Sequence, residues 1–307
     1  MSLNNGFNKI GIGNSTDDFW YQLGKKVLPS TSDILLGENL QNAIKIRLFQ
    51  TIENDLLHYQ EIAPPLLLKD TDSYVAHGRK IHIIPTFLVQ KAIMKTREDH
   101  FELYINEGIY NNQDRIDSRE IISHEIGHTY MFNIDCIPIE SFLQKDEFFS
   151  FLRYHVNDFN RIEESFASEI GRRILIPNYL LKEFLPRKPS INGMLALMDK
   201  FEVSLSTIIY RLFFDLFYYE NSLPCWIENI HCFSQNNYQI FICSNEQDVS
   251  KEMDFNLDLI QILIKEYENN TKAAPLIKKR TGCIYNEDYR MDIMFDVSDR
   301  VILCWRI

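Results

Sequence analysis

The amino-acid sequence predicts an α+β fold in which a central domain has mostly helical surroundings. Stretches with apolar residues at helical spacing are interrupted by short runs in which every second residue is apolar. Hydrophobic residues make up 45% of the 307-residue chain, which is enough for a packed core. After Pro224 the pattern changes to strand-like runs, which indicates a separate small α+β module. We therefore expect three parts, at residues 1–94, 95–223 and 225–307.

Residues 16–114 are predicted to begin as helix, to continue as strands and to end in a turn. Residues 16–60 place apolar side chains at helical spacing. Apolar and polar residues alternate over residues 80–85 and again over residues 100–106, which predicts two strands. Residues 107–114 are mostly polar and predict a turn.

Further helices and strands are predicted downstream. A helix over residues 161–175 is expected to stop at Pro177, because proline cannot donate a backbone hydrogen bond. Residues 183–193 are rich in Pro, Ser and Gly and predict a loop. The other predicted elements are helices at 139–155, 194–201, 204–219 and 255–267, a hairpin of strands 226–233 and 238–243, and strands at 290–296 and 300–306.

Charge and apolar patterning argue against several classes of function. The chain has 32 Lys and Arg residues against 43 Asp and Glu residues, a net charge of −11, and no region is basic overall. Broad electrostatic binding to nucleic acid or to an anionic membrane is therefore not expected. No run reaches the roughly 18 apolar residues of a membrane-spanning helix, and the N-terminus lacks the apolar core of a signal peptide. We expect a cytoplasmic protein whose six cysteines, none in a CxxC pair, are reduced.

His124, Glu125 and His128 form an HExxH pattern, which reads HEIGH in this sequence. Residues four apart on a helix lie on one face, so both imidazoles can reach one zinc ion. Glu125 lies beside the first ligand, where it would take a proton from the attacking water and pass it to a leaving amine. Asp117 and Glu120 match a capping box at the start of this helix. A strand, a loop and an HExxH helix in this order are typical of a zincin-like metallopeptidase.

The third metal ligand defines the subclass. The extended metzincin pattern needs Gly and His where the chain has Met131 and Ile134, so that pattern is absent. A catalytic zinc site can instead combine two histidines with a glutamate. We favour Glu164, because it shares a helix face with small residues that allow close approach to the HExxH helix: Ala167, Ser168 and Gly171. Glu163 is the alternative ligand, and it projects about 100° away from that face.

These motifs resemble the ImmA/IrrE family of zinc metallopeptidases over residues 95–215. The family typically shows HELGH and then a Glu-containing helix that ends in Leu-Leu-x-Pro. Here HEIGH is followed by a similar helix that ends in Ile-Leu-Ile-Pro at Pro177. A third stretch, residues 195–212, is similar to a helix-turn-helix-like segment of the family. Registered on Pro177, the family's Glu ligand falls on Glu164, and its usual Asn falls on Ser168, which has a shorter reach toward a zinc-bound histidine.

The resemblance implies a zinc-dependent endopeptidase of the gluzincin type, in which Glu125 is catalytic and the Zn²⁺ ligands are His124, His128 and Glu164. Family members with known roles cut helix-turn-helix transcriptional repressors. The implied partner is therefore a regulatory protein that receives limited cuts, and the implied process is transcription regulation. The 35 residues between His128 and Glu164 leave room for a helix over part of the substrate groove. The alternative function is a regulatory or binding protein that uses a zincin-like fold with little or no proteolysis.

Three further features leave alternatives open. A zinc hydrolase needs a donor for the oxyanion of the tetrahedral intermediate, and spacing does not choose among four candidates, Tyr130, Tyr154, His155 and His231. Residues 195–212 also fit a DNA-reading helix-turn-helix, but the second helix holds one Arg among large apolar residues, which favours a place in the core. The Lys-Lys-Arg run at 278–280 is most simply a solvated turn, and a binding role is the alternative.

Overall fold

Helices and sheets are both present in the computed structural model, which describes residues 73–76, 79–111, 115–130, 142–155, 159–185, 191–215, 229–235, 238–244, 279–286, 289–296 and 301–306. The predicted α+β class is therefore confirmed. The chain divides into two compact units, Met1–Leu181 and Lys182–Ile307. The three-part division expected from the sequence stays a prediction. The helices predicted at 16–60 and 255–267 lie outside the described residues.

The first unit contains a four-stranded sheet with the order β1-β2-β4-β3. Its strands are β1 (Ser73–Ala76), β2 (Arg79–Thr86), β3 (Ala92–Thr96) and β4 (His100–Asn106). The central strands β2 and β4 are parallel, and each edge strand is antiparallel to its neighbour. The strands predicted at 80–85 and 100–106 are confirmed as β2 and β4. The sequence does not predict β1 or β3.

One face of this sheet is apolar because side chains alternate between the two faces along a strand. On β4, Phe101, Leu103 and Ile105 are buried, and the residues between them are half-buried. Ile81 and Ile83 on β2 are buried as well, and the parallel register pairs them with Phe101 and Leu103. The two central strands thus present one continuous apolar surface.

The helices described up to residue 184 are α4 (Glu107–Tyr110), α5 (Arg115–Thr129), α6 (Phe142–His155), α7 (Phe159–Leu175) and α8 (Asn178–Phe184). The helix predicted at 161–175 is confirmed as α7, which ends before Pro177 as expected. The helix predicted at 139–155 is confirmed as α6 over its described residues. A helix therefore does lie in the segment between the HExxH motif and Glu164.

Two predictions near the start of α5 are wrong. Residues 107–114 do not form only a turn, because α4 occupies the first four of them. The side-chain oxygen of Asn106 caps α4 by accepting a hydrogen bond of 2.9 Å from the backbone N–H of Gly108. Asp117 does not cap the HExxH helix, because α5 begins at Arg115 and includes Asp117 in its first turn. An acidic residue there still favours the helix through its dipole.

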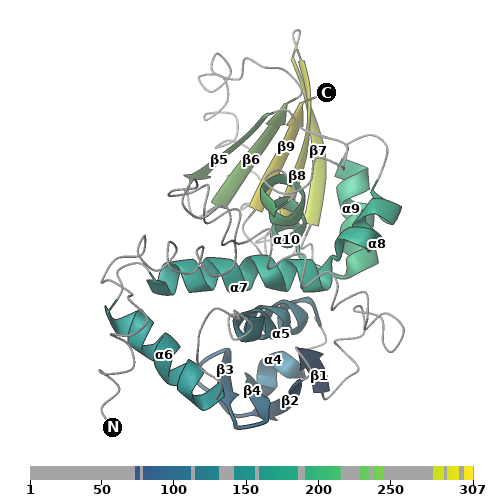
Figure 1. Cartoon of the computed structure of the whole chain (residues 1–307). Coiled ribbons are helices and arrows are strands. Elements are labelled where there is room, and N and C mark those ends of the chain that lie inside the picture. Colours follow the sequence, from purple (N-terminus) through teal and green to yellow (C-terminus); the bar gives the residue numbers. More distant parts are fainter. Residues whose placement is uncertain are drawn as a thin grey trace. The chain divides into compact units, whose positions relative to one another are not determined.

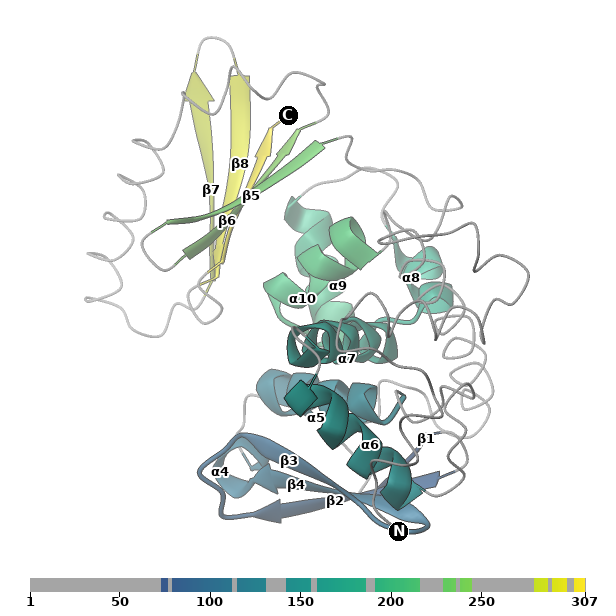
Figure 2. The ribbon, with the colours of Figure 1, turned by 60° about the vertical axis from the view of Figure 1, so that its left-hand side comes forward.

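The helix that carries the HExxH motif is the middle layer of the first unit. Figures 1 and 2 show α5 between the four-stranded sheet and α7, and α5 contacts β3, β4 and α7. Ile122 and Ile126 of α5 are buried. On α7, Phe166, Ile170 and Ile174 form a buried apolar stripe. The HExxH helix is therefore held from two sides.

The α5 and α7 backbones approach closely where each helix has a glycine. A Cβ atom on Gly127 would overlap the carbonyl oxygen of Ala167 and would lie 3.0 Å from its Cα. A Cβ atom on Gly171 would lie 3.0 Å from the backbone N and Cα of His124. From the first contact to the second, the residue number on α7 rises from 167 to 171 while that on α5 falls from 127 to 124. The two helices are therefore antiparallel. The predicted small-residue contact is confirmed, and the HExxH motif itself supplies half of it.

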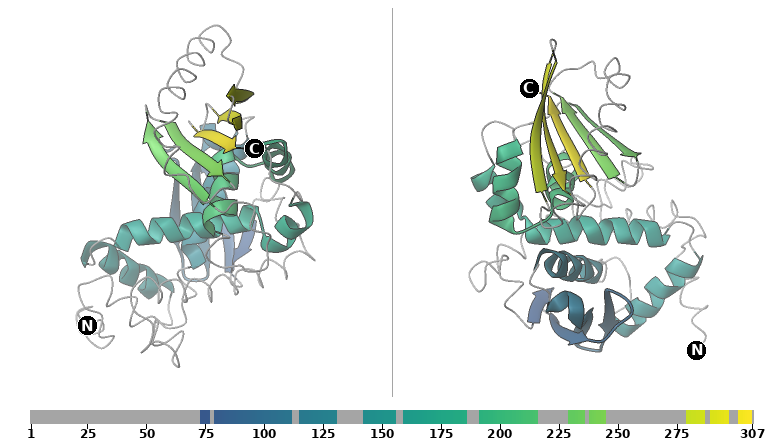
Figure 3. Two further views of the ribbon diagram at one scale, coloured as in Figure 1. Left: turned by 90° about the horizontal axis from the view of Figure 1, so that it is seen from above. Right: turned by 180° about the vertical axis from the view of Figure 1, so that it is seen from behind.

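The second unit combines short helices with a five-stranded sheet, seen from two further sides in Figure 3. Its sheet has the order β5-β6-β9-β8-β7, with β6 and β9 parallel and the other pairs antiparallel. Besides the end of α8, its described elements are α9 (Ile191–Phe201), α10 (Leu205–Ile209), the π-helix η3 (Tyr210–Asp215), β5 (Asn229–Gln235), β6 (Tyr238–Ser244), β7 (Lys279–Asn286), β8 (Tyr289–Asp296) and β9 (Val301–Arg306). The predicted hairpin corresponds to β5 and β6, and the two predicted C-terminal strands correspond to β8 and β9.

Three predictions for the second unit need correction. The segment 183–193 is not all loop, because α8 includes its start and α9 includes its end. The Lys-Lys-Arg run does not form a turn throughout, since β7 begins at Lys279. The helix predicted at 204–219 begins as α10 but continues as the π-helix η3 over its described residues.

The described part of α10 is not available to read DNA. Leu205, Ile208 and Ile209 are buried, and Thr207 is only 8% exposed. A recognition helix must present side chains to the edges of the bases, so the structure favours the packing role that the sequence predicts. Among the described residues, no helix combines the length and the apolar character needed to cross a membrane.

We expect Gly127→Ala to lower the free energy of unfolding by about 2 kcal/mol, because the new methyl group overpacks the contact with Ala167. Alanine is favoured over glycine in a helix by only about 1 kcal/mol, which does not offset that overlap. Urea unfolding followed by circular dichroism measures the change. The matched control is Gly108→Ala, whose Cβ would meet only the side-chain oxygen of Asn106, at 3.1 Å. Equal stability of the two variants would contradict the close α5–α7 contact.

Candidate metal centre

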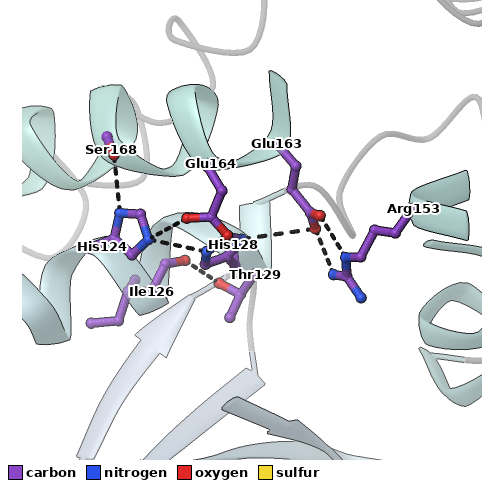
Figure 4. Close-up of polar contacts among 8 residues, drawn as sticks. All are labelled: His124, Ile126, His128, Thr129, Arg153, Glu163, Glu164 and Ser168. Atoms are coloured by element: carbon purple, nitrogen blue, oxygen red, sulfur yellow. Dashed lines mark hydrogen bonds and ion pairs between the residues drawn. The ribbon is translucent and has the colours of Figure 1, made fainter. Parts of the chain in front are cut away.

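Three side chains on two helices converge at one point of the first unit. His124 and His128 lie one turn apart on α5, and Glu164 reaches them from α7 (Figure 4). The Nε2 atoms of the two histidines are 3.2 Å apart. One Glu164 oxygen is 3.2 Å from Nε2 of His124, and the other is 3.7 Å from Nε2 of His128. All candidate ligand atoms of this group lie within 4.8 Å of one another, so the group could hold a metal ion.

The Nδ1 atoms of the two histidines face other partners. Nδ1 of His124 is 3.1 Å from the hydroxyl oxygen of Ser168, which lies one helical turn after Glu164 on α7. Nδ1 of His128 is 3.8 Å from a carboxylate oxygen of Glu163. Each ring is therefore oriented from its Nδ1 side and presents Nε2 to the shared point. The short Ser168 side chain therefore reaches the His124 ring.

The two adjacent glutamates on α7 point to different places. Glu164 joins the histidines and its side chain is 52% exposed, whereas the Glu163 side chain is 2% exposed. Both oxygens of Glu163 accept hydrogen bonds of 2.6 Å from the guanidinium group of Arg153 on α6. The structure thus brings together the residues that the sequence favours, and it gives the alternative, Glu163, another partner.

The surroundings shift the pKa values of the two histidines in opposite directions. Burial lowers the pKa of His124, and positive charge on His128 lowers it further, while Glu164 opposes both effects. Burial alone would also lower the pKa of His128, but three carboxylates outweigh it and raise the pKa: Glu163, Glu125 and Glu164. A neutral imidazole can donate its lone pair to a metal. The negative charges around His128 also favour a bound cation.

The half-buried Glu125 and the buried Glu163 also differ in their pKa values. Burial raises the pKa of Glu125, with His128 opposing and Glu164 adding to the shift. Burial would also raise the pKa of Glu163, but the hydrogen bonds from Arg153 and the interaction with His128 outweigh it and lower the pKa. Glu125 is therefore the carboxylate that takes up a proton more readily, and Glu163 is held as an anion.

The other predicted site residues fall in different environments. Tyr130 follows α5 and is 2% exposed, whereas Tyr154 on α6 is 85% exposed. The side chains of His155 and His231 lie outside the described part of the structure. The choice of an oxyanion donor among these four residues stays a prediction.

Sequence reasoning missed Arg153 entirely and treated Glu163 only as a rival ligand. One signal for Glu163 is present in the sequence. It projects about 100° away from the small-residue face of α7, on the same side as the apolar residues Ile170 and Ile174. A carboxylate among apolar residues requires a charged or hydrogen-bonding partner. The sequence alone does not say that this partner is Arg153.

Comparison of the chain with protein-family models, with curated proteins and with solved structures finds no match. These comparisons therefore assign no role to this group of residues.

We expect the unmodified chain to bind about one divalent transition metal ion, and Glu164→Ala to bind it more than about 100-fold more weakly, beyond the range typical of residues that only support a ligand. Because Glu164 is exposed, the substitution should change the free energy of unfolding of the metal-free chain by less than about 0.5 kcal/mol. Elemental mass spectrometry after dialysis measures the metal content. Ser165→Ala, at the next exposed position of α7, is the control. Metal retained in full by Glu164→Ala would exclude this ligand set.

Proposed function

We propose that the chain is a zinc-dependent endopeptidase of the gluzincin type, with His124, His128 and Glu164 as zinc ligands. The observation that carries this proposal is the convergence of these three side chains beside a fourth, Glu125, that can transfer protons. An HExxH helix held against a Glu-bearing helix is also the arrangement that a zincin-like fold requires.

The donor atoms fit a zinc ion in type and in spacing. Two imidazoles and one carboxylate are a typical ligand set for catalytic zinc. Ligands at the usual bond length of about 2.05 Å in a tetrahedron lie roughly 3.3 Å apart. The two Nε2 atoms are 3.2 Å apart here, and two different Glu164 oxygens lie 3.2 Å from Nε2 of His124 and 3.7 Å from Nε2 of His128, which is near that spacing. Among the described residues, three supply donors to this group, which agrees with a catalytic site that keeps one position for water or substrate.

Peptide hydrolysis assigns a separate task to each of these residues. When bound, zinc supplies the Lewis acid that polarises the substrate carbonyl and makes water more acidic. Glu125 takes the proton from the attacking water and delivers it to the leaving amine. Its raised pKa suits both steps, because proton transfer is most effective when the pKa of the group lies near the working pH. Ser168 holds the His124 ring in position through Nδ1.

The proposed substrate class is a regulatory protein such as a helix-turn-helix transcriptional repressor, cut at a limited number of sites. The resemblance of HEIGH and of the α7 sequence to the ImmA/IrrE family supports this part of the proposal. The position of Ser168 beside His124 adds to it, because the family's Asn falls at the same position of the sequence.

We expect Glu125→Gln to keep its zinc and to lower the rate of peptide cleavage by about 10²- to 10⁴-fold, the usual contribution of a general base. The assay mixes the zinc-loaded chain with a peptide library and identifies new termini by mass spectrometry. Glu164→Ala, which removes a ligand, should lose zinc and cleavage together.

The two variants also separate the proposed enzyme from a protein that acts only by binding. Zinc-dependent cuts that disappear with Glu125→Gln support an endopeptidase. A cellular effect that survives Glu125→Gln, in a chain that yields no cuts, would sink the proposal in favour of a regulatory or binding protein.

A further inference from the structure

A salt bridge between α6 and α7 lies next to His128, on the Nδ1 side of its ring. Arg153 Nε donates to one oxygen of Glu163, and a second guanidinium nitrogen donates to the other oxygen, both at 2.6 Å. Figure 4 shows Glu163 between Arg153 and His128. The distance from Nδ1 of His128 to the nearer Glu163 oxygen is 3.8 Å, which is within ion-pair range.

The end of α6 that carries Arg153 is anchored in the core. Phe149 and Leu152 are both fully buried, and they lie four and one residues before Arg153 on α6. The Phe149 ring stacks on the ring of Phe159, the first residue of α7, at a centroid distance of 6.4 Å. The backbone position of Arg153 is therefore fixed relative to the start of α7. Its guanidinium group is held in turn by two hydrogen bonds in a planar fork.

A buried carboxylate in this position acts on the histidine in a defined way. A negative charge beside Nδ1 favours the form of the ring that carries its hydrogen on Nδ1, which leaves the Nε2 lone pair for a metal. Glu163 needs Arg153 to be held there as an anion, because burial of an unpaired carboxylate is costly. The effect on His128 therefore requires both residues, one from each helix.

We propose that Arg153 and Glu163 form a positioning pair that holds the His128 ring with Nε2 toward the metal, so that α6 contributes to the affinity of a site whose ligands lie on α5 and α7. This inference rests on the proposed function, because it concerns the same zinc site. The pair contains no ligand: Arg153 acts through Glu163, and Glu163 acts through His128.

Co²⁺ titration of the full-length, chelator-stripped chain tests the pair, because the visible absorption of Co²⁺ reports both affinity and ligand geometry. We expect the unmodified chain to bind one Co²⁺ ion and Glu163→Gln to bind it about 10- to 100-fold more weakly, with altered absorption bands. Arg153→Met should weaken binding as well. The double variant Arg153→Met/Glu163→Gln should bind no more weakly than Glu163→Gln alone, since Arg153 acts only through Glu163.

The matched controls separate positioning from general stability. Arg161→Met removes an exposed Arg from the same helix as Glu163 and should leave Co²⁺ binding unchanged. Arg153→Lys keeps the charge without the planar fork and should restore part of the affinity lost in Arg153→Met. Thermal unfolding of each metal-free variant shows which chains fold. If Arg153→Met does not fold, the double variant still tests the pair, because it leaves no buried charge without a partner.

The outcomes distinguish this inference from the proposed function. An unmodified chain that binds neither Co²⁺ nor Zn²⁺ removes both. Tight Co²⁺ binding in the unmodified chain, with the same affinity and the same bands in Glu163→Gln and in the double variant, overturns the positioning pair and leaves the zinc site intact. Additive losses of affinity in the double variant also overturn it, because they mean that Arg153 acts independently of Glu163.

Discussion

The close approach of α5 and α7 sets the distance on which the rest of the first unit depends. Each helix brings a glycine to the contact, and the backbone of the other helix occupies the space that a side chain would take. Only at this separation does Glu164 on one helix reach His124 and His128 on the other. Gly127 is thus part of the packing as well as part of the HExxH motif. The sheet beneath α5 supports the contact by burying the opposite side of that helix.

The parts of the site that follow from helical periodicity could be predicted from the sequence. Two histidines four residues apart lie on one face whatever surrounds them, and Glu164 shares a face with residues small enough for a close contact. The strands β2 and β4 could be predicted for a similar reason, since alternation over six or seven residues is a strong local signal. β3 was not, because its five residues include a lysine and its apolar residues do not alternate clearly. The prediction that Asp117 caps α5 was wrong because a capping sequence does not fix where a helix begins.

What sequence reasoning could not supply is the pairing of groups distant in the chain. Arg153 and Glu163 are ten residues apart on different helices, and nothing local connects them. The buried glutamate, Glu163, pairs with Arg153. The exposed one, Glu164, lies beside the two histidines. That division depends on where α6 packs, through Phe149 and Phe159, and packing of this kind is a property of the folded chain. For the same reason, the charge of Lys279 and Arg280 predicted a turn, although these residues begin an edge strand of the second sheet. Charged residues are common in edge strands.

The unequal exposure of the three converging side chains bears on how the chain would acquire and lose its ion. The side chains of His124 and His128 are 27% and 16% exposed, whereas that of Glu164 is 52% exposed. Glu164 is thus the one of the three whose side chain has most room to turn into solvent. On the proposed function, we expect zinc to enter the folded chain by displacement of this carboxylate, so that its residence time depends on the motion of a single surface group. Folded chains without metal would then be inactive until zinc binds, and the active share of all chains would rise with the concentration of free zinc.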